Sequence, residues 1–116
     1  MKFTLRYDGE AIGKEPLDNG TYQIGRHTGK ANVTIRGPGF EENGTVIGES
    51  DIINLVISRK HLEMEVSDER LTLRDLGSMN GSYIDGKQFN ETEVKKSGRC
   101  LLTLGRNFSL EFITSE

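Results

Sequence analysis

Short stretches in which apolar and polar residues alternate, each followed by a glycine-containing turn, constrain the fold of this chain most. Alternation is clear over residues 3–7, 62–66 and 108–112, and a period of two places every second side chain on one face of a β-strand. Dipeptides such as Asp8-Gly9 and Asp85-Gly86 are typical of tight turns between strands. No stretch has a 3.6-residue apolar period over three helical turns. These features predict an all-β domain, either a β-sandwich or a β-barrel.

The same patterns locate the individual strands. Strands are expected over residues 3–7, 22–24, 33–35, 62–66, 71–73, 83–84, 101–104 and 108–112. Residues 36–51 contain several turn signals and are expected to form a long inserted loop or hairpin, with 45–47 as its returning strand. The apolar run at 52–57 leads directly into Ser58. Since there is no linker, repeat or low-complexity tract, residues 1–116 are expected to form a single domain.

The charge of the chain limits the partners that it can bind. Its 15 basic and 18 acidic residues give a net charge of −3, which argues against general affinity for nucleic acid because such affinity requires a broad basic face. A nucleic-acid-binding β-barrel is also disfavoured, because no exposed aromatic platform is evident. No apolar run approaches the roughly twenty residues of a membrane-spanning helix, and the N-terminus does not resemble a signal peptide. We therefore expect an intracellular, cytoplasmic protein without a nucleic-acid or membrane partner.

Neither a metal nor a cofactor is expected. The single cysteine, Cys100, allows no internal disulfide and no zinc cluster, and its apolar neighbours predict a buried thiol. Asp75, Asn80 and Asp85 carry oxygen ligands, but glycine and methionine stand at the intervening positions, so the segment does not fit a calcium-binding loop.

Three short segments carry the residues best suited to bind an anion. The segment 58–61, Ser-Arg-Lys-His, stands directly before the strand expected at 62–66, Gly25-Arg26 ends an earlier strand, and Asn80-Gly81 lies in a loop. A hydroxyl and a guanidinium together suit a doubly charged group rich in hydrogen-bond acceptors, such as a phosphate. Residues at the end of a strand are held on one side and open to solvent on the other, which suits a binding loop. Taken singly, an exposed surface arginine at position 26 and a turn serine at position 58 are the simpler interpretations.

The other residues of these segments have alternative roles. If the chain is extended here, Arg59 and Lys60 point in opposite directions, and Arg59 is the one expected to face the site. Asn80 either occupies a turn with positive φ or uses its carboxamide to bind the main chain of an extended ligand. Ser58 and His61 are conceivable as nucleophile and base, but no third, orienting acid is evident. We expect His61 to hold the loop through hydrogen bonds to the backbone.

Taken together, these segments resemble the forkhead-associated (FHA) domain, a phosphothreonine-binding module. The matching segments are residues 22–26, Tyr-Gln-Ile-Gly-Arg; 57–62, Ile-Ser-Arg-Lys-His-Leu; 75–86, from Asp75 to Gly86; and 98–105, which resembles the penultimate strand of the family. The order of the segments, the spacing of the second and third, and the all-β pattern agree with the family. The resemblance spans about residues 3–113.

The resemblance implies a β-sandwich of two twisted sheets, about eleven strands in all, with the binding loops at one end. It also implies a non-catalytic module that recognises phosphothreonine in partner proteins, downstream of a Ser/Thr protein kinase. The implied site consists of the phosphate-binding residues Arg26, Ser58 and Arg59, the peptide-backbone-binding residue Asn80, and the supporting residues Gly25, His61, Met79 and Gly81. The small pocket that favours threonine over serine would lie near Asn80.

The sequence departs from the family pattern in two places. The segment between Arg26 and Ser58 is longer than usual and includes loops that normally help to read the residues that follow the phosphothreonine; its insertion, residues 36–51, is acidic. Met79 stands before Asn80, where many members have a hydroxyl residue that adds a phosphate contact. A second hypothesis is therefore an FHA-like assembly module that binds partners or itself independently of phosphate. The sequence predicts neither the oligomeric state nor the residues that flank the phosphothreonine.

Overall fold

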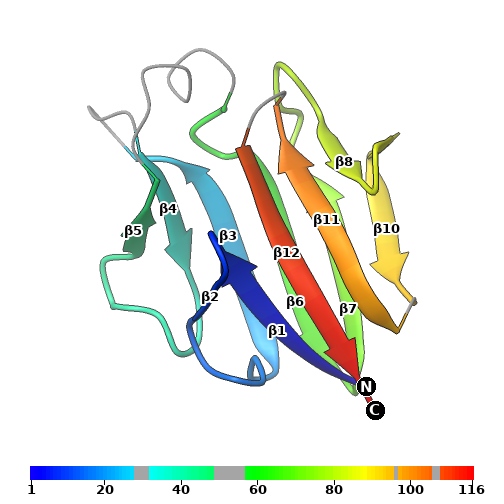
Figure 1. Ribbon diagram of the computed structural model, residues 1–116. Helices are drawn as coiled ribbons and strands as arrows, with labels where there is room; N and C mark the ends of the chain where they lie inside the picture. The colour runs from blue at the N-terminus through cyan, green and yellow to red at the C-terminus, as the bar shows by residue number, and fades with distance from the viewer. Residues whose placement is uncertain (28–31, 49–56, 96, 106–107) are drawn as a thin grey trace.

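The computed structural model describes residues 1–27, 32–48, 57–95, 97–105 and 108–116. This part of the chain forms two antiparallel sheets of six strands each (Figure 1). The first sheet has the order β2 (Glu10–Ile12), β1 (Lys2–Tyr7), β12 (Phe108–Ser115), β11 (Gly98–Leu104), β8 (Ser82–Ile84) and β9 (Lys87–Phe89). The second has the order β10 (Glu91–Val94), β7 (Arg70–Asp75), β6 (Leu62–Ser67), β3 (Gly20–Arg26), β4 (Val33–Arg36) and β5 (Thr45–Ile47).

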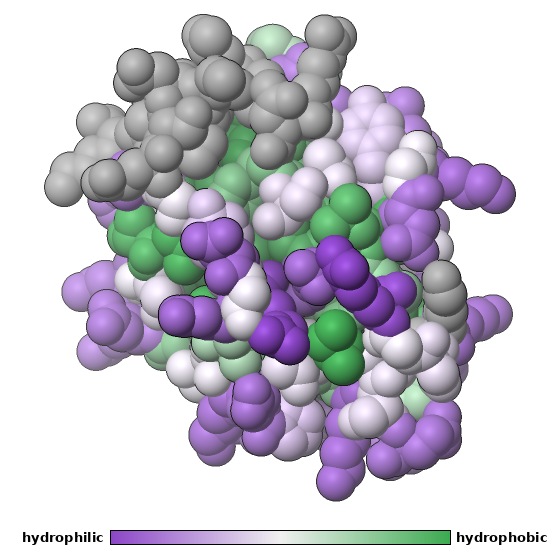
Figure 2. Space-filling model, viewed as in Figure 1, coloured by the Kyte–Doolittle hydropathy of each residue, from purple (hydrophilic) through white to green (hydrophobic). Residues whose placement is uncertain are grey.

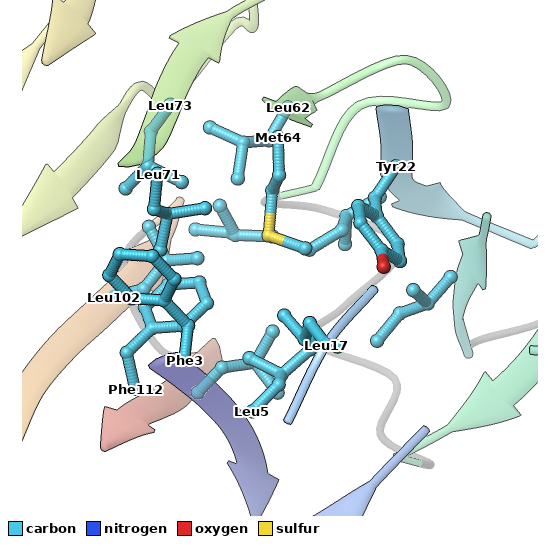
Figure 3. Close-up of a cluster of buried hydrophobic side chains, with 14 of the residues drawn as sticks. Phe3, Leu5, Leu17, Tyr22, Leu62, Met64, Leu71, Leu73, Leu102 and Phe112 are labelled. Atoms are coloured by element: carbon cyan, nitrogen blue, oxygen red, sulfur yellow. The ribbon is translucent and has the colours of Figure 1, made fainter. Parts of the chain in front are cut away.

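The core lies between the two sheets, and the alternation in the sequence decides which side chains enter it. In β6 and β12 every second residue is buried, and the intervening residues face outward. Figure 3 shows side chains from both sheets meeting in this layer. The largest fully buried side chains include Phe3, Leu5, Tyr22, Met64, Leu71, Leu73, Leu102 and Phe112. The fold is therefore the all-β sandwich that the sequence predicted, not a barrel.

The strands that the sequence did not predict lie at the edges of the sheets. β2 and β9 are the edge strands of the first sheet and β10 is an edge strand of the second. β2 and β9 have no fully buried residue, and β10 has one, Val94. Edge strands bury little apolar surface, so they lack the alternation that identifies the central strands.

The inserted segment is a hairpin in its described part. β4 and β5 pair antiparallel, with Ile35 opposite Thr45, as predicted for residues 45–47. Phe40, in the connection between them, packs edge-on against Tyr22 with ring centroids 6.0 Å apart, and this contact anchors the hairpin to the core. Residues 49–51 and most of the apolar run at 52–57 lie outside the described residues, but Ile57 at its end is buried.

Three loop regions gather at one end of the sandwich (Figure 1). These are the end of β3, the segment 57–61 before β6, and the segment 76–81 between β7 and β8. Both chain termini lie at the opposite end. The candidate residues of the sequence are thus concentrated in one region, away from the termini.

On the face of the first sheet that Figure 2 shows, hydrophilic side chains surround small apolar areas. Leu101 on β11 is the one large hydrophobic residue of this sheet that is exposed among the described residues, at 37%. Arg99 and Glu111 form an ion pair with 2.8 Å between Nε and Oε2 on β11 and β12. In its described part, this face has no continuous apolar area of the kind that a stable sheet-to-sheet assembly would bury.

Candidate functional site

The end of β3 and the segment 58–61 are packed backbone against backbone. The Arg26 N–H donates to the Ser58 carbonyl at 3.0 Å, and the His61 N–H donates to the Ile24 carbonyl at 3.1 Å. Between these bonds lies Gly25, where an added Cβ would stand 1.7 Å from the Arg59 carbonyl oxygen. Only glycine fits here, because the neighbouring atoms are main chain and cannot rotate away. This contact fixes Arg26 beside the loop that carries Ser58 and Arg59.

His61 joins the segment 58–61 to the loop between β7 and β8. Its side chain is fully buried; Nδ1 accepts a hydrogen bond from the Ser58 N–H at 3.1 Å, and Nε2 lies 2.7 Å from the Gly81 carbonyl. Because Nδ1 accepts, the proton of the neutral ring is on Nε2 and is donated to Gly81. Burial lowers the pKa of His61 despite the opposing influence of the Gly81 carbonyl and of Asp75. Both ring nitrogens are engaged with backbone groups, so neither is free to take a proton from the Ser58 hydroxyl.

Asp75 organises the same loop from inside, and the sequence analysis did not single it out for this role. One carboxylate oxygen accepts from the N–H groups of Gly77 and Ser78, at 3.1 and 3.0 Å. The other accepts from the hydroxyls of Ser78 and Ser82, both at 2.6 Å, and lies 3.9 Å from Nε2 of His61. Burial acts to raise the pKa of Asp75, but the hydrogen bonds from the two serines outweigh it and the pKa is lowered. The local signal was present, since an aspartate at the start of a turn commonly accepts from residues two and three further on.

The loop tip next to His61 connects directly to Ser58. The Ser58 hydroxyl accepts a hydrogen bond from the Met79 N–H at 3.1 Å. This bond does not use the hydroxyl proton, and the described residues offer it no acceptor. The Met79 side chain is 87% exposed. The Tyr83 hydroxyl donates to the Asn80 carbonyl at 3.1 Å, and a Cβ on Gly81 would stand 2.7 Å from a side-chain nitrogen of Gln88 at a φ of +86°. The flexible Gln88 side chain can move away, so it is the positive φ at 81 that favours glycine, and this turn sets how Asn80 is presented.

A groove of about 360 Å³ opens beside this junction. It is lined by Gln23, Ile24, Gly25, Arg26, His27, Thr34, Arg36, Arg59 and Lys60. Four of these residues are lysine or arginine, and none carries a carboxylate. Both Arg59 and Lys60 line the groove, whereas an extended chain would direct only one of them there; residues 59 and 60 form a bend instead. An anion would meet concentrated positive charge here, although the whole chain is acidic.

The candidate residues are thus brought together as two adjoining parts. Arg26 and Arg59 line the groove, and Ser58 and Met79 join the two loops at its end. Among the described residues, no cluster of His, Cys, Asp and Glu could hold a metal ion. Cys100, the only cysteine, is buried in the core.

The fold is a β-sandwich, and its loops at one end carry basic and hydroxyl groups. This arrangement is typical of a domain that binds an anionic ligand through its loops. The sequence profile of the FHA domain matches residues 22–105, which is most of the chain, and the chain belongs to the FHA family. The match supports a role for this chain as a phosphopeptide-binding protein-interaction module. FHA domains are recognised as non-catalytic. In the described part, no helix is long and apolar enough to cross a membrane. A comparison with curated proteins gave no match.

Solved structures with the same fold are also FHA domains. One comes from a structural and functional analysis of phosphothreonine-dependent FHA domain interactions; it is 21% identical, with a TM-score of 0.63, over 100% of this chain and 99% of that one. The FHA domain of the CT664 protein from Chlamydia trachomatis is 18% identical, with a TM-score of 0.66 and full coverage of both chains. The FhaA FHA domain complexed with the intracellular domain of Rv3910 is 22% identical, with a TM-score of 0.58, over 96% of this chain and 97% of that one. At these identities the likeness concerns the fold.

Proposed function

We propose that this domain binds phosphothreonine in partner proteins and so reads the products of Ser/Thr protein kinases. The observation that carries the proposal is the junction of the segment 58–61 with the loop 76–81, beside a groove. The described lining of this groove contains four cations and no carboxylate. The family supplies the class of ligand. Two of the similar structures concern phosphothreonine-dependent interactions and a complex with a protein domain, which agrees with a protein ligand.

The proposed roles follow from the donors that each residue offers. The guanidinium groups of Arg26 and Arg59 bind phosphate oxygens, and the Ser58 hydroxyl donates its proton to the same group. The Asn80 carboxamide binds the main chain of the peptide beside the phosphothreonine. Gly25 supports the phosphate-binding residues, because it allows the close contact that positions Arg26.

The strength of binding can be estimated from these contacts. A phosphothreonine carries nearly two negative charges at pH 7, and each hydrogen bond to a charged group is worth roughly 1.5–3 kcal/mol. Three or four such bonds must offset desolvation and the ordering of the peptide, so an affinity of about micromolar is expected. Because the chain has a net charge of −3, unmodified acidic peptides are repelled by most of the surface.

The proposal is tested with a degenerate peptide library presented in phosphothreonine, phosphoserine and unphosphorylated forms. We expect selective capture of the phosphothreonine peptides, and Arg26→Ala should abolish detectable binding while leaving the urea unfolding curve close to that of the wild type. Arg99→Ala is the matched control, because Arg99 lies on the other sheet in an ion pair with Glu111, and it should bind normally. Normal binding by Arg26→Ala would show that the proposed site is wrong. Equal binding of phosphorylated and unphosphorylated peptides would favour the phosphate-independent assembly module.

A further inference from the structure

The peptide bond between Asn80 and Gly81 is held at both of its polar ends. Its N–H, which belongs to Gly81, donates to the Ser78 hydroxyl oxygen at 3.0 Å. Its carbonyl, which belongs to Asn80, accepts from the Tyr83 hydroxyl at 3.1 Å. A peptide bond is planar, so hydrogen bonds at its two ends together fix the orientation of the plane. They thereby orient the backbone from which the Asn80 side chain leaves.

The two anchors of this peptide bond belong to different parts of the fold. Ser78 lies in the loop itself, and its hydroxyl donates in turn to Asp75 at 2.6 Å. Tyr83 lies on β8, which is paired with β11 on one side and with β9 on the other. A residue on a strand paired on both sides is held more firmly than a residue in a loop. Tyr83 thus ties the Asn80 carbonyl to the first sheet.

The Tyr83 ring also packs against the turn. A Cβ added at Gly81 would stand 3.1 Å from the Tyr83 hydroxyl oxygen and 3.3 Å from Cζ of the same ring. The hydroxyl end of the ring therefore lies directly beside Gly81, and its oxygen is oriented toward the preceding carbonyl. Tyr83 is half-buried, so water can reach this region when the hydroxyl is removed. Its removal should therefore cost less stability than the loss of a fully buried hydrogen bond.

The residue after Asn80 is held independently of Tyr83. The Gly81 carbonyl accepts from Nε2 of His61 at 2.7 Å and from the Gly105 N–H at 2.9 Å. These two hydrogen bonds keep the loop closed on the sandwich when the Tyr83 hydroxyl is absent. Removal of that hydroxyl therefore frees one peptide group to reorient, while the loop as a whole stays in place.

We propose that Tyr83 is a positioning residue of the peptide-binding site, whose hydroxyl holds the turn in which Asn80 presents its carboxamide to the main chain of the ligand. This inference rests on the proposed function, because it assigns that contact to Asn80. Arg26 and Ser58 lie on other segments, which are joined by a backbone hydrogen bond of their own. Loss of the Tyr83 hydroxyl should therefore weaken the contact to the peptide main chain and spare the contacts to the phosphate.

The test compares Tyr83→Phe, which removes the hydroxyl and keeps the ring, with the wild type on two ligands. One ligand is a phosphothreonine peptide, measured by calorimetry; the other is phenyl phosphate, a phosphate monoester without a peptide main chain, measured by NMR titration. We expect Tyr83→Phe to bind the peptide about threefold to tenfold more weakly. Its affinity for phenyl phosphate should stay within about twofold of the wild type.

Tyr22→Phe is the matched control, because the Tyr22 hydroxyl also donates to a backbone carbonyl, that of Asp18, at 2.6 Å. Tyr22 is fully buried in the core. This variant should lower the urea midpoint at least as much as Tyr83→Phe and bind both ligands as the wild type does. The control thus separates an effect on the site from a loss of stability.

A double variant shows whether Tyr83 acts through Asn80. When Asn80→Ala has removed the side chain that the turn presents, adding Tyr83→Phe should change the peptide affinity by less than about twofold. If the double variant instead shows the full threefold to tenfold further loss, Tyr83 acts independently of Asn80 and the inference is overturned.

The remaining outcomes separate this inference from the proposed function. If the wild type binds the phosphothreonine peptide and Tyr83→Phe binds it equally well, the inference is overturned and the proposed function stands. An equal loss of affinity for the peptide and for phenyl phosphate would also overturn it, because the whole site would then have loosened. If the wild type does not bind the peptide in a phosphate-dependent manner, both proposals fail.

Discussion

Replacing Gly25 by alanine tests how the fold positions the proposed phosphate-binding residues. The added Cβ would stand 1.7 Å from the Arg59 carbonyl oxygen, 2.6 Å from its carbon and 3.2 Å from the Ser58 oxygen. To bring the closest contact out to 3.0 Å, the segment 58–60 and β3 must separate by about 1.3 Å. No side-chain rotation relieves the contact, because all three atoms belong to the backbone.

That separation has an energetic cost that the structure allows us to estimate. Forced overpacking typically costs about 1–3 kcal/mol. The two backbone hydrogen bonds on either side, from Arg26 to Ser58 and from His61 to Ile24, are worth about 0.5–1.5 kcal/mol each and would be stretched. We expect Gly25→Ala to lower the free energy of unfolding by about 2–4 kcal/mol. The affinity for a phosphothreonine peptide should fall about tenfold or more, because Arg26 and Ser58 move apart.

Urea unfolding followed by fluorescence or circular dichroism measures the first effect, and calorimetry with a phosphothreonine peptide measures the second. Gly86→Ala is the control: it lies in the turn between β8 and β9, its added Cβ meets nothing within 4 Å, and only its φ of +84° disfavours alanine. This control should cost about 1 kcal/mol and leave binding unchanged. If Gly25→Ala unfolds at the same urea concentration as the wild type and binds equally well, the close packing of the segment 58–60 on β3 is refuted.

Two further predictions concern the loop junction. Because the pKa of His61 lies below its usual value of 6.5, the unfolded chain binds the proton more readily, so the free energy of unfolding should fall as the pH falls below 6.5. The physical reason is burial, which disfavours the charged ring; a proton on Nδ1 would also face the Ser58 N–H, with two donors opposed. Urea midpoints at pH 7.5 and 5.5 measure the effect. His61→Gln should lose this pH dependence, whereas His27→Gln should keep it, and an unchanged slope in His61→Gln would contradict the assignment. Met79→Ser should raise the affinity for phosphothreonine peptides by about twofold to tenfold by adding a hydroxyl donor beside Ser58; calorimetry with phosphorylated and unphosphorylated peptides tests this, and a loss of affinity would indicate that the exposed methionine itself contacts the peptide.

Much of the fold followed from local patterns. The alternation in β1, β6 and β12 predicted both the strands and the faces that they bury, since burying one face of a strand requires an apolar residue at every second position. The edge strands β2, β9 and β10 were missed for the same reason, because they bury few side chains. The residue types of the site were also visible in the sequence, as short segments rich in hydroxyl, basic and amide groups.

The sequence by itself determined an all-β chain and the chemical groups that an anion site needs. Only the tertiary structure decided which of them lie together. His61 reaches Gly81 across 20 residues of sequence, and the Ser58 hydroxyl meets the Met79 N–H across 21. The pairing of Arg74 with glutamates, and the gathering of four cations in the groove, depend on the register between strands. Hydrogen bonds and ion pairs act over a few ångströms, so a partner distant in sequence is fixed only when strand pairing brings it within that range.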